Sequence, residues 1–220
     1  MLNWNYKKIS KDYLPRQFEY HPTNNNVLFG CLSGECLIVD PSSDQNQTTS
    51  LGNFGRKDND VILGLCWLRN RTNHFVCGSG NGNVTYNKSN TDAFLSCDST
   101  TTGESNTNIL RTFPIFPELT SIHVNCADEW LLLSGYTSKC DVLDIESGKL
   151  VRSLEGIHKN HINISRFTHT SPNIFATCSF DETVKMWDMR VCNTAGSTTE
   201  GEGEQKPIYS VKCDSGMSVW

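Results

Sequence analysis

The 220-residue chain lacks the features that mark several classes of protein. It has no run of eighteen apolar residues, so no membrane span is expected, and its opening stretch, MLNWNYKKISKDYLPRQF, has no apolar core of a secretory signal. A net charge of -5 gives no overall positive field that would favour nucleic acid. Ten cysteines are present without a C-x-x-C pair, which predicts reduced thiols rather than a zinc site or a disulfide framework. We therefore expect a protein that is not secreted and has no nucleic-acid or membrane partner.

What the chain does contain is one pattern repeated four times. Each copy has an apolar strand, a polar turn, a second strand with small residues and a third strand that ends in Asp or Asn. The third strands end at Asp40, Asn87, Asp144 and Asp188. The copies cover approximately residues 14–40, 60–87, 119–144 and 156–190. This pattern predicts four repeated β-units and no helix.

Polar stretches separate the units and predict loops. The stretches 41–50, 88–108 and 193–206 are rich in residues such as Ser, Thr, Asn and Gly. We assign residues 1–13 to a lead-in, 191–206 to a polar loop and 207–220 to the start of a further, truncated unit. Repeated units bury their faces only against neighbours, so we expect a partial product of a larger protein. The alternative is a small ring that is closed or completed by a partner.

The last unit carries four polar side chains of complementary chemistry. They are those of His158, Asp181, Trp187 and a hydroxyl, for which Ser179 is preferred and Thr177 is the alternative. An imidazole, a carboxylate, an indole N–H and a hydroxyl satisfy one another where water is excluded. This predicts a structural tetrad. The same residue types form catalytic triads, but the chain has no G-x-S-x-G nucleophile motif.

Metal and cofactor sites are not predicted either. The histidines of this unit, His158, His161 and His169, are spread over a loop and a strand and do not share one ligand face. Gly78-Ser-Gly-Asn-Gly82 precedes a strand instead of a helix, so it predicts a β-turn and not a phosphate-binding loop. We expect no catalytic residue, no metal and no cofactor, and hence a protein that is not an enzyme.

The segment 156–190 resembles a WD40 repeat, and its ending, Trp187-Asp188-Met189-Arg190, resembles the end of a DWD box that would run from Phe175 to Arg190. Five further segments resemble plant proteins of the DWD-hypersensitive-to-UV-B type, which join a leucine-rich-repeat region to a WD40 region. These segments are Leu14–Pro22, Val61–Leu68, Leu119–Asn125, Leu132–Lys139 and His161–Phe167.

The resemblance implies an all-β fold, a partial β-propeller of about four WD40 blades from a larger closed ring. It also implies a non-enzymatic interaction module of the nucleus or cytoplasm, a substrate receptor or adaptor of a cullin-4 RING E3 ubiquitin ligase in light or UV-B signalling. Asp188 and Arg190 would dock on the damaged-DNA-binding adaptor of that ligase, and light-signalling regulators would be further partners. Three alternatives stay open: a generic WD40 scaffold, a nonfunctional fragment, and an Arg190 that only decorates the edge of a blade.

Overall fold

The computed structural model describes residues 13–41, 48–55, 60–90, 107–191 and 206–213. These residues form sixteen strands and no helix, arranged as four sheets of four antiparallel strands. The all-β fold and the partial propeller predicted from the sequence are thereby confirmed. The strands are β1 (Pro15–Tyr20), β2 (Val27–Cys31), β3 (Glu35–Val39), β4 (Thr48–Asn53), β5 (Ile62–Trp67), β6 (His74–Ser79), β7 (Val84–Ser89), β8 (Thr107–Thr112), β9 (Leu119–Val124), β10 (Trp130–Gly135), β11 (Cys140–Asp144), β12 (Leu150–Leu154), β13 (Ile162–Phe167), β14 (Ile174–Ser179), β15 (Thr183–Asp188) and β16 (Tyr209–Lys212).

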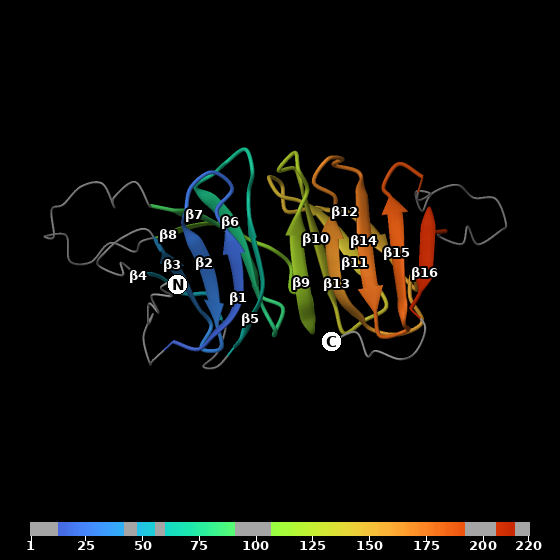
Figure 1. Cartoon of the computed structure of the whole chain (residues 1–220), viewed down its shortest axis with the longest axis horizontal. Helices are drawn as coiled ribbons and strands as arrows, with labels where there is room; N and C mark the ends of the chain where they lie inside the picture. The colour runs from blue at the N-terminus through green and yellow to red at the C-terminus, as the bar shows by residue number, and fades with distance from the viewer. Residues whose placement is uncertain (1–12, 42–47, 56–59, 91–106, 192–205, 214–220) are drawn as a thin grey trace, which may run out of the picture.

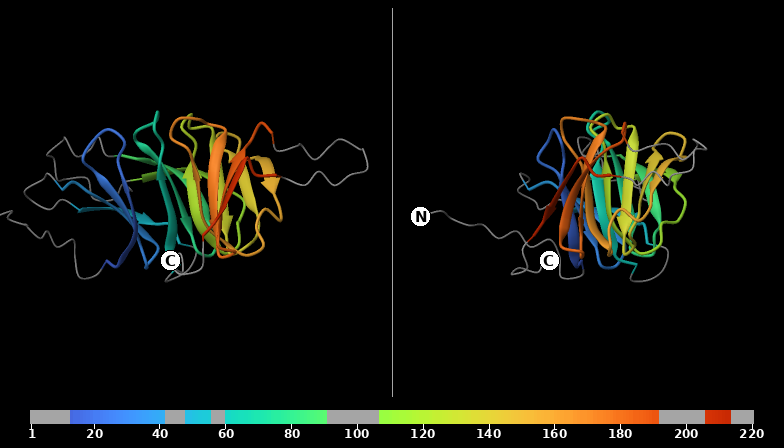
Figure 2. Two further views of the ribbon diagram at one scale, coloured as in Figure 1. Left: turned by 45° about the vertical axis from the view of Figure 1, so that its right-hand side comes forward. Right: turned by 90° about the vertical axis from the view of Figure 1, so that its right-hand side faces the viewer.

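The sheets follow one another in chain order around a common axis. The first strand of each sheet, β1, β5, β9 or β13, lies toward the middle of the molecule (Figures 1 and 2). β1 contacts β5, β5 contacts β9, and β9 contacts β13. None of the described segments forms an apolar helix of membrane-spanning length.

A fourth strand completes each sheet beyond the three strands that the sequence pattern predicted. β4, β8, β12 and β16 pair with β3, β7, β11 and β15. Tyr209–Lys212, which we placed at the start of a further unit, pairs with β15 through Met186 and Tyr209. All four residues of β16 are exposed, so the strand carries no apolar alternation that a sequence pattern could detect. The predicted segments 1–12, 192–205 and 214–220 lie outside the described residues.

Glycines allow the first three sheets to approach one another closely. A Cβ at Gly64 would lie 2.7 Å from Cγ1 of Ile122, and one at Gly30 would lie 2.5 Å from Cγ2 of Ile62. Each sheet thus presents a position without a side chain to a branched side chain on the next sheet. The eight described cysteines are free thiols, and five of them are buried.

The third and fourth sheets meet through hydroxyl groups instead. Ser165 on β13 donates to the hydroxyl of Ser134 at 2.9 Å, and the hydroxyl of Ser121 donates to the carbonyl of Ser165 at 3.2 Å. All three serines are buried. The contact therefore fixes the fourth sheet by hydrogen bonds in addition to apolar packing.

The first sheet has an open apolar face. By the strand register, Phe18 on β1 corresponds to Leu65 on β5 and Ile122 on β9. Phe18 is 58% exposed, whereas Leu65 and Ile122 are 3% and 1% exposed. Across the axis, Nη1 of Arg166 on β13 lies 2.9 Å from Oε1 of Glu19 on β1, so an ion pair joins the two ends of the arc.

Candidate functional site

The fourth sheet holds both groups of residues that the sequence singled out. His158 lies on the loop before β13, and Asp181 lies in the turn between β14 and β15. Trp187 and Asp188 end β15, and Arg190 follows in a turn. His158, Asp181 and Trp187 belong to a buried group. Asp188 and Arg190 form a second group, which reaches the surface through Arg190.

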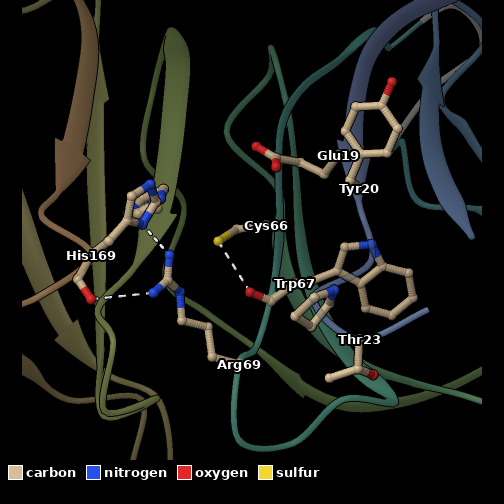
Figure 3. A pocket seen from close by; sticks show the side chains of 9 residues that line it. Glu19, Tyr20, Thr23, Cys66, Trp67, Arg69 and His169 are labelled. Carbon is tan, nitrogen blue, oxygen red and sulfur yellow. Dashed lines mark hydrogen bonds between the residues drawn. The ribbon is translucent and has the colours of Figure 1, made fainter. Parts of the chain in front are cut away.

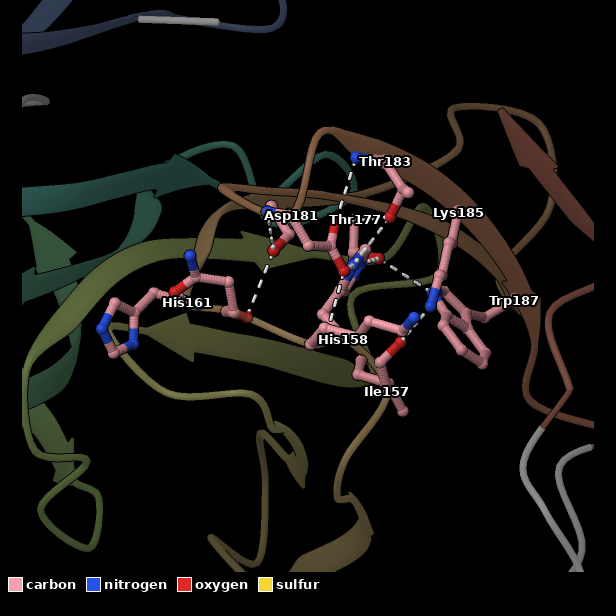
Figure 4. Close-up of polar contacts among 11 residues, drawn as sticks. Ile157, His158, His161, Thr177, Asp181, Thr183, Lys185 and Trp187 are labelled. Atoms are coloured by element: carbon pink, nitrogen blue, oxygen red, sulfur yellow. Dashed lines mark hydrogen bonds and ion pairs between the residues drawn. The ribbon is translucent and has the colours of Figure 1, made fainter. Parts of the chain in front are cut away.

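The buried group is a hydrogen-bonded relay of four side chains (Figure 4). Nδ1 of His158 lies 2.9 Å from Oδ2 of Asp181, and its Nε2 lies 2.7 Å from Oγ1 of Thr177. The indole Nε1–H of Trp187 donates to the same hydroxyl oxygen at 2.9 Å. One proton arrangement satisfies every member: imidazole Nδ1–H donates to the carboxylate, the hydroxyl donates to Nε2, and the indole donates to the hydroxyl.

Burial sets the charge states of the relay. It lowers the pKa of His158, and the contact with Asp181 opposes this effect. Burial raises the pKa of Asp181, but bonds from the Thr183 hydroxyl, the Lys159 N–H and His158 outweigh it and hold that pKa well below its usual range. A neutral imidazole thus faces a carboxylate. Thr177 is 1% exposed, and its hydroxyl hydrogen-bonds to His158 and Trp187 away from solvent. The relay therefore joins the loop before β13 and the turn after β14 to strands β14 and β15 by buried hydrogen bonds.

Thr177, and not the preferred Ser179, supplies the hydroxyl of the relay. Ser179 instead donates to the carbonyl of Asn160 at 3.1 Å and accepts the N–H of Asp181 at 3.1 Å. The register explains the choice: Trp187 pairs with Phe175, two residues from Thr177 and four from Ser179. The indole spans the shorter interval along the strand and cannot reach the longer one.

The corresponding positions of the second sheet carry smaller groups. Asn87 pairs with Phe75 as Trp187 pairs with Phe175. The amide of Asn87 donates to the hydroxyl of Thr85 at 3.0 Å, but its buried Oδ1 has no hydrogen-bond partner in the described part of the chain. The satisfied relay is therefore a property of the fourth sheet that the second does not share.

The surface group is a bidentate pair between Arg190 and Asp188. Nη2 of Arg190 lies 2.6 Å from Oδ2 of Asp188, and its Nε lies 3.0 Å from Oδ1. The side chain of Arg190 is 65% exposed and that of Asp188 only 8%. The guanidinium holds the pKa of Asp188 below its usual value. The buried Asp188 carboxylate thus orients the Arg190 side chain, and Arg190 is the residue of the pair that reaches solvent.

Comparison with known proteins matches this architecture. No family model matches the chain. It is 36% identical over 190 residues to "Protein DWD HYPERSENSITIVE TO UV-B 1" of Arabidopsis thaliana, which covers 84% of this chain and 23% of that protein. It is 28% identical over 97 residues to cell division cycle protein cdt2 of Schizosaccharomyces pombe, covering 42% of this chain and 19% of that protein. It is 27% identical over 122 residues to nuclear distribution protein PAC1 of Candida tropicalis, covering 51% of this chain and 24% of that protein.

The chain belongs to the WD40-repeat proteins.

As a WD40 protein, the chain has four blades, one for each sheet, and it spans about a quarter or less of the length of these curated relatives. The similar proteins are WD40-repeat proteins, which are typically interaction modules. In the described ranges, no cluster of three His, Cys, Asp or Glu side chains is arranged to hold a metal ion.

Two features of the WD40 arc were missed by sequence reasoning. One is the serine contact between the third and fourth blades, which joins residues more than thirty positions apart. The other is a cavity at the axis, into which loops of three blades project. Neither has a local sequence signal, because each is assembled by the packing of separate blades.

Proposed function

We propose that the fourth blade is the docking surface of a substrate receptor or adaptor for a cullin-4 RING E3 ubiquitin ligase. In this proposal Arg190 contacts the damaged-DNA-binding adaptor of the ligase, and the protein acts in the nucleus in light or UV-B signalling. The observation that supports this proposal is the Asp188–Arg190 ion pair, in which a buried carboxylate holds an exposed arginine in one orientation.

The pair defines what the adaptor must offer. A guanidinium has five N–H donors, and Asp188 receives those of Nε and Nη2. The remaining N–H groups point away from Asp188, and the pair as a whole has no net charge. A carbonyl or hydroxyl oxygen of the adaptor therefore fits this position better than a second carboxylate.

The arginine is also held in place before binding. The backbone N–H of Arg190 donates to Oδ1 of Asp188 at 2.9 Å. The neighbouring Met189 is buried in the core of the third and fourth blades, and its N–H donates to the carbonyl of Asn173 at 2.8 Å. A side chain that is already ordered loses less conformational entropy when a partner binds.

The chain is similar to a relative whose name contains both DWD and UV-B, and this name supports the proposed DWD-type docking and the proposed role in UV-B signalling. Because the chain spans 23% of that relative, the role of the whole protein is part of the proposal.

Pull-down of the purified adaptor by the chain tests the proposal. Arg190→Ala is expected to weaken binding by about thirtyfold or more, the effect of losing one interface hot spot. Arg111→Ala is the control, because Arg111 is an arginine of the second blade whose side chain donates to a backbone carbonyl, that of Ser147, and not to a neighbouring carboxylate.

Asp188→Asn separates orientation from contact. The variant keeps the arginine but loses its charged partner, so an intermediate loss of binding is expected. Binding that is the same for wild type, Arg190→Ala and Arg111→Ala would refute the docking role and favour a WD40 scaffold that uses another surface.

A further inference from the structure

A cavity of about 550 Å³ opens at the axis of the arc (Figure 3). It lies where the inner strands of the first three blades end, and a loop of the fourth blade borders it. Its volume is within the range of small-molecule sites. Its lining includes Glu19, Tyr20, Trp67, Arg69, His123 and His169.

His123 directs a fixed hydrogen-bond donor toward this cavity. The backbone N–H of Phe167 donates to Nδ1 of His123 at 3.1 Å, so the proton of the neutral ring lies on Nε2. Burial lowers the pKa of His123 to about 3, and nearby Arg166, His169 and Arg69 act in the same direction. The ring is 8% exposed and lines the cavity, yet its Nε2–H has no hydrogen-bond partner in the described ranges.

Arg69 supplies a second set of donors that is also held in place. Its Nη1 donates to the carbonyl of His169 at 3.2 Å, and its Nη2 contacts Nδ1 of the same residue. The loop beneath it is clamped, because the carboxylate of Asp128 accepts the backbone N–H groups of Arg69, Asn70 and Arg71 at 2.8, 2.6 and 3.1 Å. The other N–H groups of Arg69 remain available to a ligand.

The one carboxylate among the lining residues is already paired. Glu19 accepts Nη1 of Arg166 at 2.9 Å, so its charge is balanced within the protein. Cys66 adds no charge, since burial raises the pKa of its thiol to about 12. The groups that face the cavity therefore add up to a positive site with Arg69 and His123 as donors.

The remaining lining combines Thr23 with largely apolar side chains. Tyr20 lines the cavity with a side chain that is 69% exposed, and Pro22 and Trp67 continue the same wall. We propose that this cavity binds a small organic acid, whose carboxylate or phosphate accepts hydrogen bonds from His123 and Arg69 while its apolar or aromatic body lies against Tyr20 and Pro22. Arg190 does not line the cavity.

Titration of the whole chain with benzoate, followed by NMR of the histidine side chains at constant ionic strength, tests the proposal. We expect a saturable shift of the His123 imidazole resonances. Arg69→Gln should weaken benzoate binding about tenfold or more, because a charge-assisted hydrogen bond is lost. Arg111→Gln, which removes another arginine that holds a loop carbonyl, should bind benzoate as the wild type does.

Two further ligands separate the parts of the site. Benzyl alcohol has the ring without the charge and inorganic phosphate has the charge without the ring, so each should bind more weakly than benzoate. Absence of a shift at His123 with benzoate overturns the proposal without requiring any variant to fold. If benzyl alcohol binds as tightly as benzoate, the cavity does not recognise the acidic group and the proposal is wrong. If inorganic phosphate binds as tightly as benzoate, the apolar wall does not contribute and the proposed organic acid is wrong.

Discussion

The relay of the fourth blade gives the sharpest prediction of stability. Thr177→Val keeps the shape of the side chain and removes the hydroxyl that joins His158 to Trp187. The indole N–H and the imidazole Nε2 then lose their partner in a site where Trp187 and the His158 side chain are 0% exposed. At about 1–3 kcal/mol for each of the two orphaned buried groups, the free energy of unfolding should fall by about 2–6 kcal/mol.

Urea unfolding of the wild type and the variant measures this difference. Ser179→Ala is the matched control, because Ser179 lies on the same strand and bonds only to backbone groups of the loop and turn beside it. It should cost about 2 kcal/mol, the net value of two ordinary hydrogen bonds. A loss in Thr177→Val no larger than that in Ser179→Ala would refute the assignment of Thr177 to the relay.

A double-mutant cycle checks the mechanism behind that loss. Trp187→Phe removes the indole N–H that Thr177→Val would orphan, so the double variant should be more stable than the sum of the two single effects predicts. Simple additivity would mean that the bond from the indole to the hydroxyl does not contribute to stability.

Three further outcomes follow from the contacts between blades. The folded pKa of His123 is about 3 against an unfolded value of 6.5, so the unfolded chain takes up this proton first as the pH falls. The contribution of His123 to stability should therefore be complete above pH 6.5 and decline by about 1.4 kcal/mol per pH unit between pH 6.5 and pH 3. Urea unfolding of His123→Gln should show a slope that is smaller than that of the wild type by this amount, and an unchanged slope would contradict the prediction. Gly64→Ala places a Cβ 2.7 Å from Cγ1 of Ile122 and should lower the free energy of unfolding by about 1–3 kcal/mol. Partial recovery is expected when Ile122→Ala is added, because that change removes the Cγ atoms that the new Cβ meets; no recovery would contradict a clash at this contact. Asp128→Ala removes the acceptor of three backbone N–H groups in residues 69–71. Amide hydrogen exchange should become faster in these residues but not in the fourth blade. Unchanged exchange in residues 69–71 would show that Asp128 is not needed to order the loop.

Most of the inner three strands of the blades were predictable because they bury runs of apolar side chains. β6 and β10, for example, are almost wholly buried, so their apolar runs stand out from the polar turns around them. The fourth strands were missed because they lie at the outer edge. β16 is exposed along its length, and only its pairing with β15 defines it as a strand.

The buried site was predictable by residue type but not by partner. Thr177 and Ser179 are separated by two positions on β14 and so point to the same face. Only the reach of the Trp187 side chain distinguishes them, and that depends on the register with β15. The spacing of two positions likewise suggests that Asp188 and Arg190 lie close together. It does not reveal that the Asp188 side chain is buried and that of Arg190 is exposed.

The axial cavity had no basis for prediction. Arg69, His123 and His169 come from loops or strands of three different blades, and their spacing along the chain follows from the lengths of the blades rather than from any motif. Their convergence depends on how tightly the blades pack.

The serine contact between the last two blades restricts how such a chain is rearranged by duplication or exchange of units. The fourth unit fits behind the third because Ser165 meets Ser121 and Ser134. In the fourth unit itself the positions corresponding to those two serines are Ile164 and Cys178. A second copy of the fourth unit placed behind the first would therefore set the Ser165 hydroxyl against an isoleucine and a thiol. The units of this chain are similar in fold but not interchangeable in order.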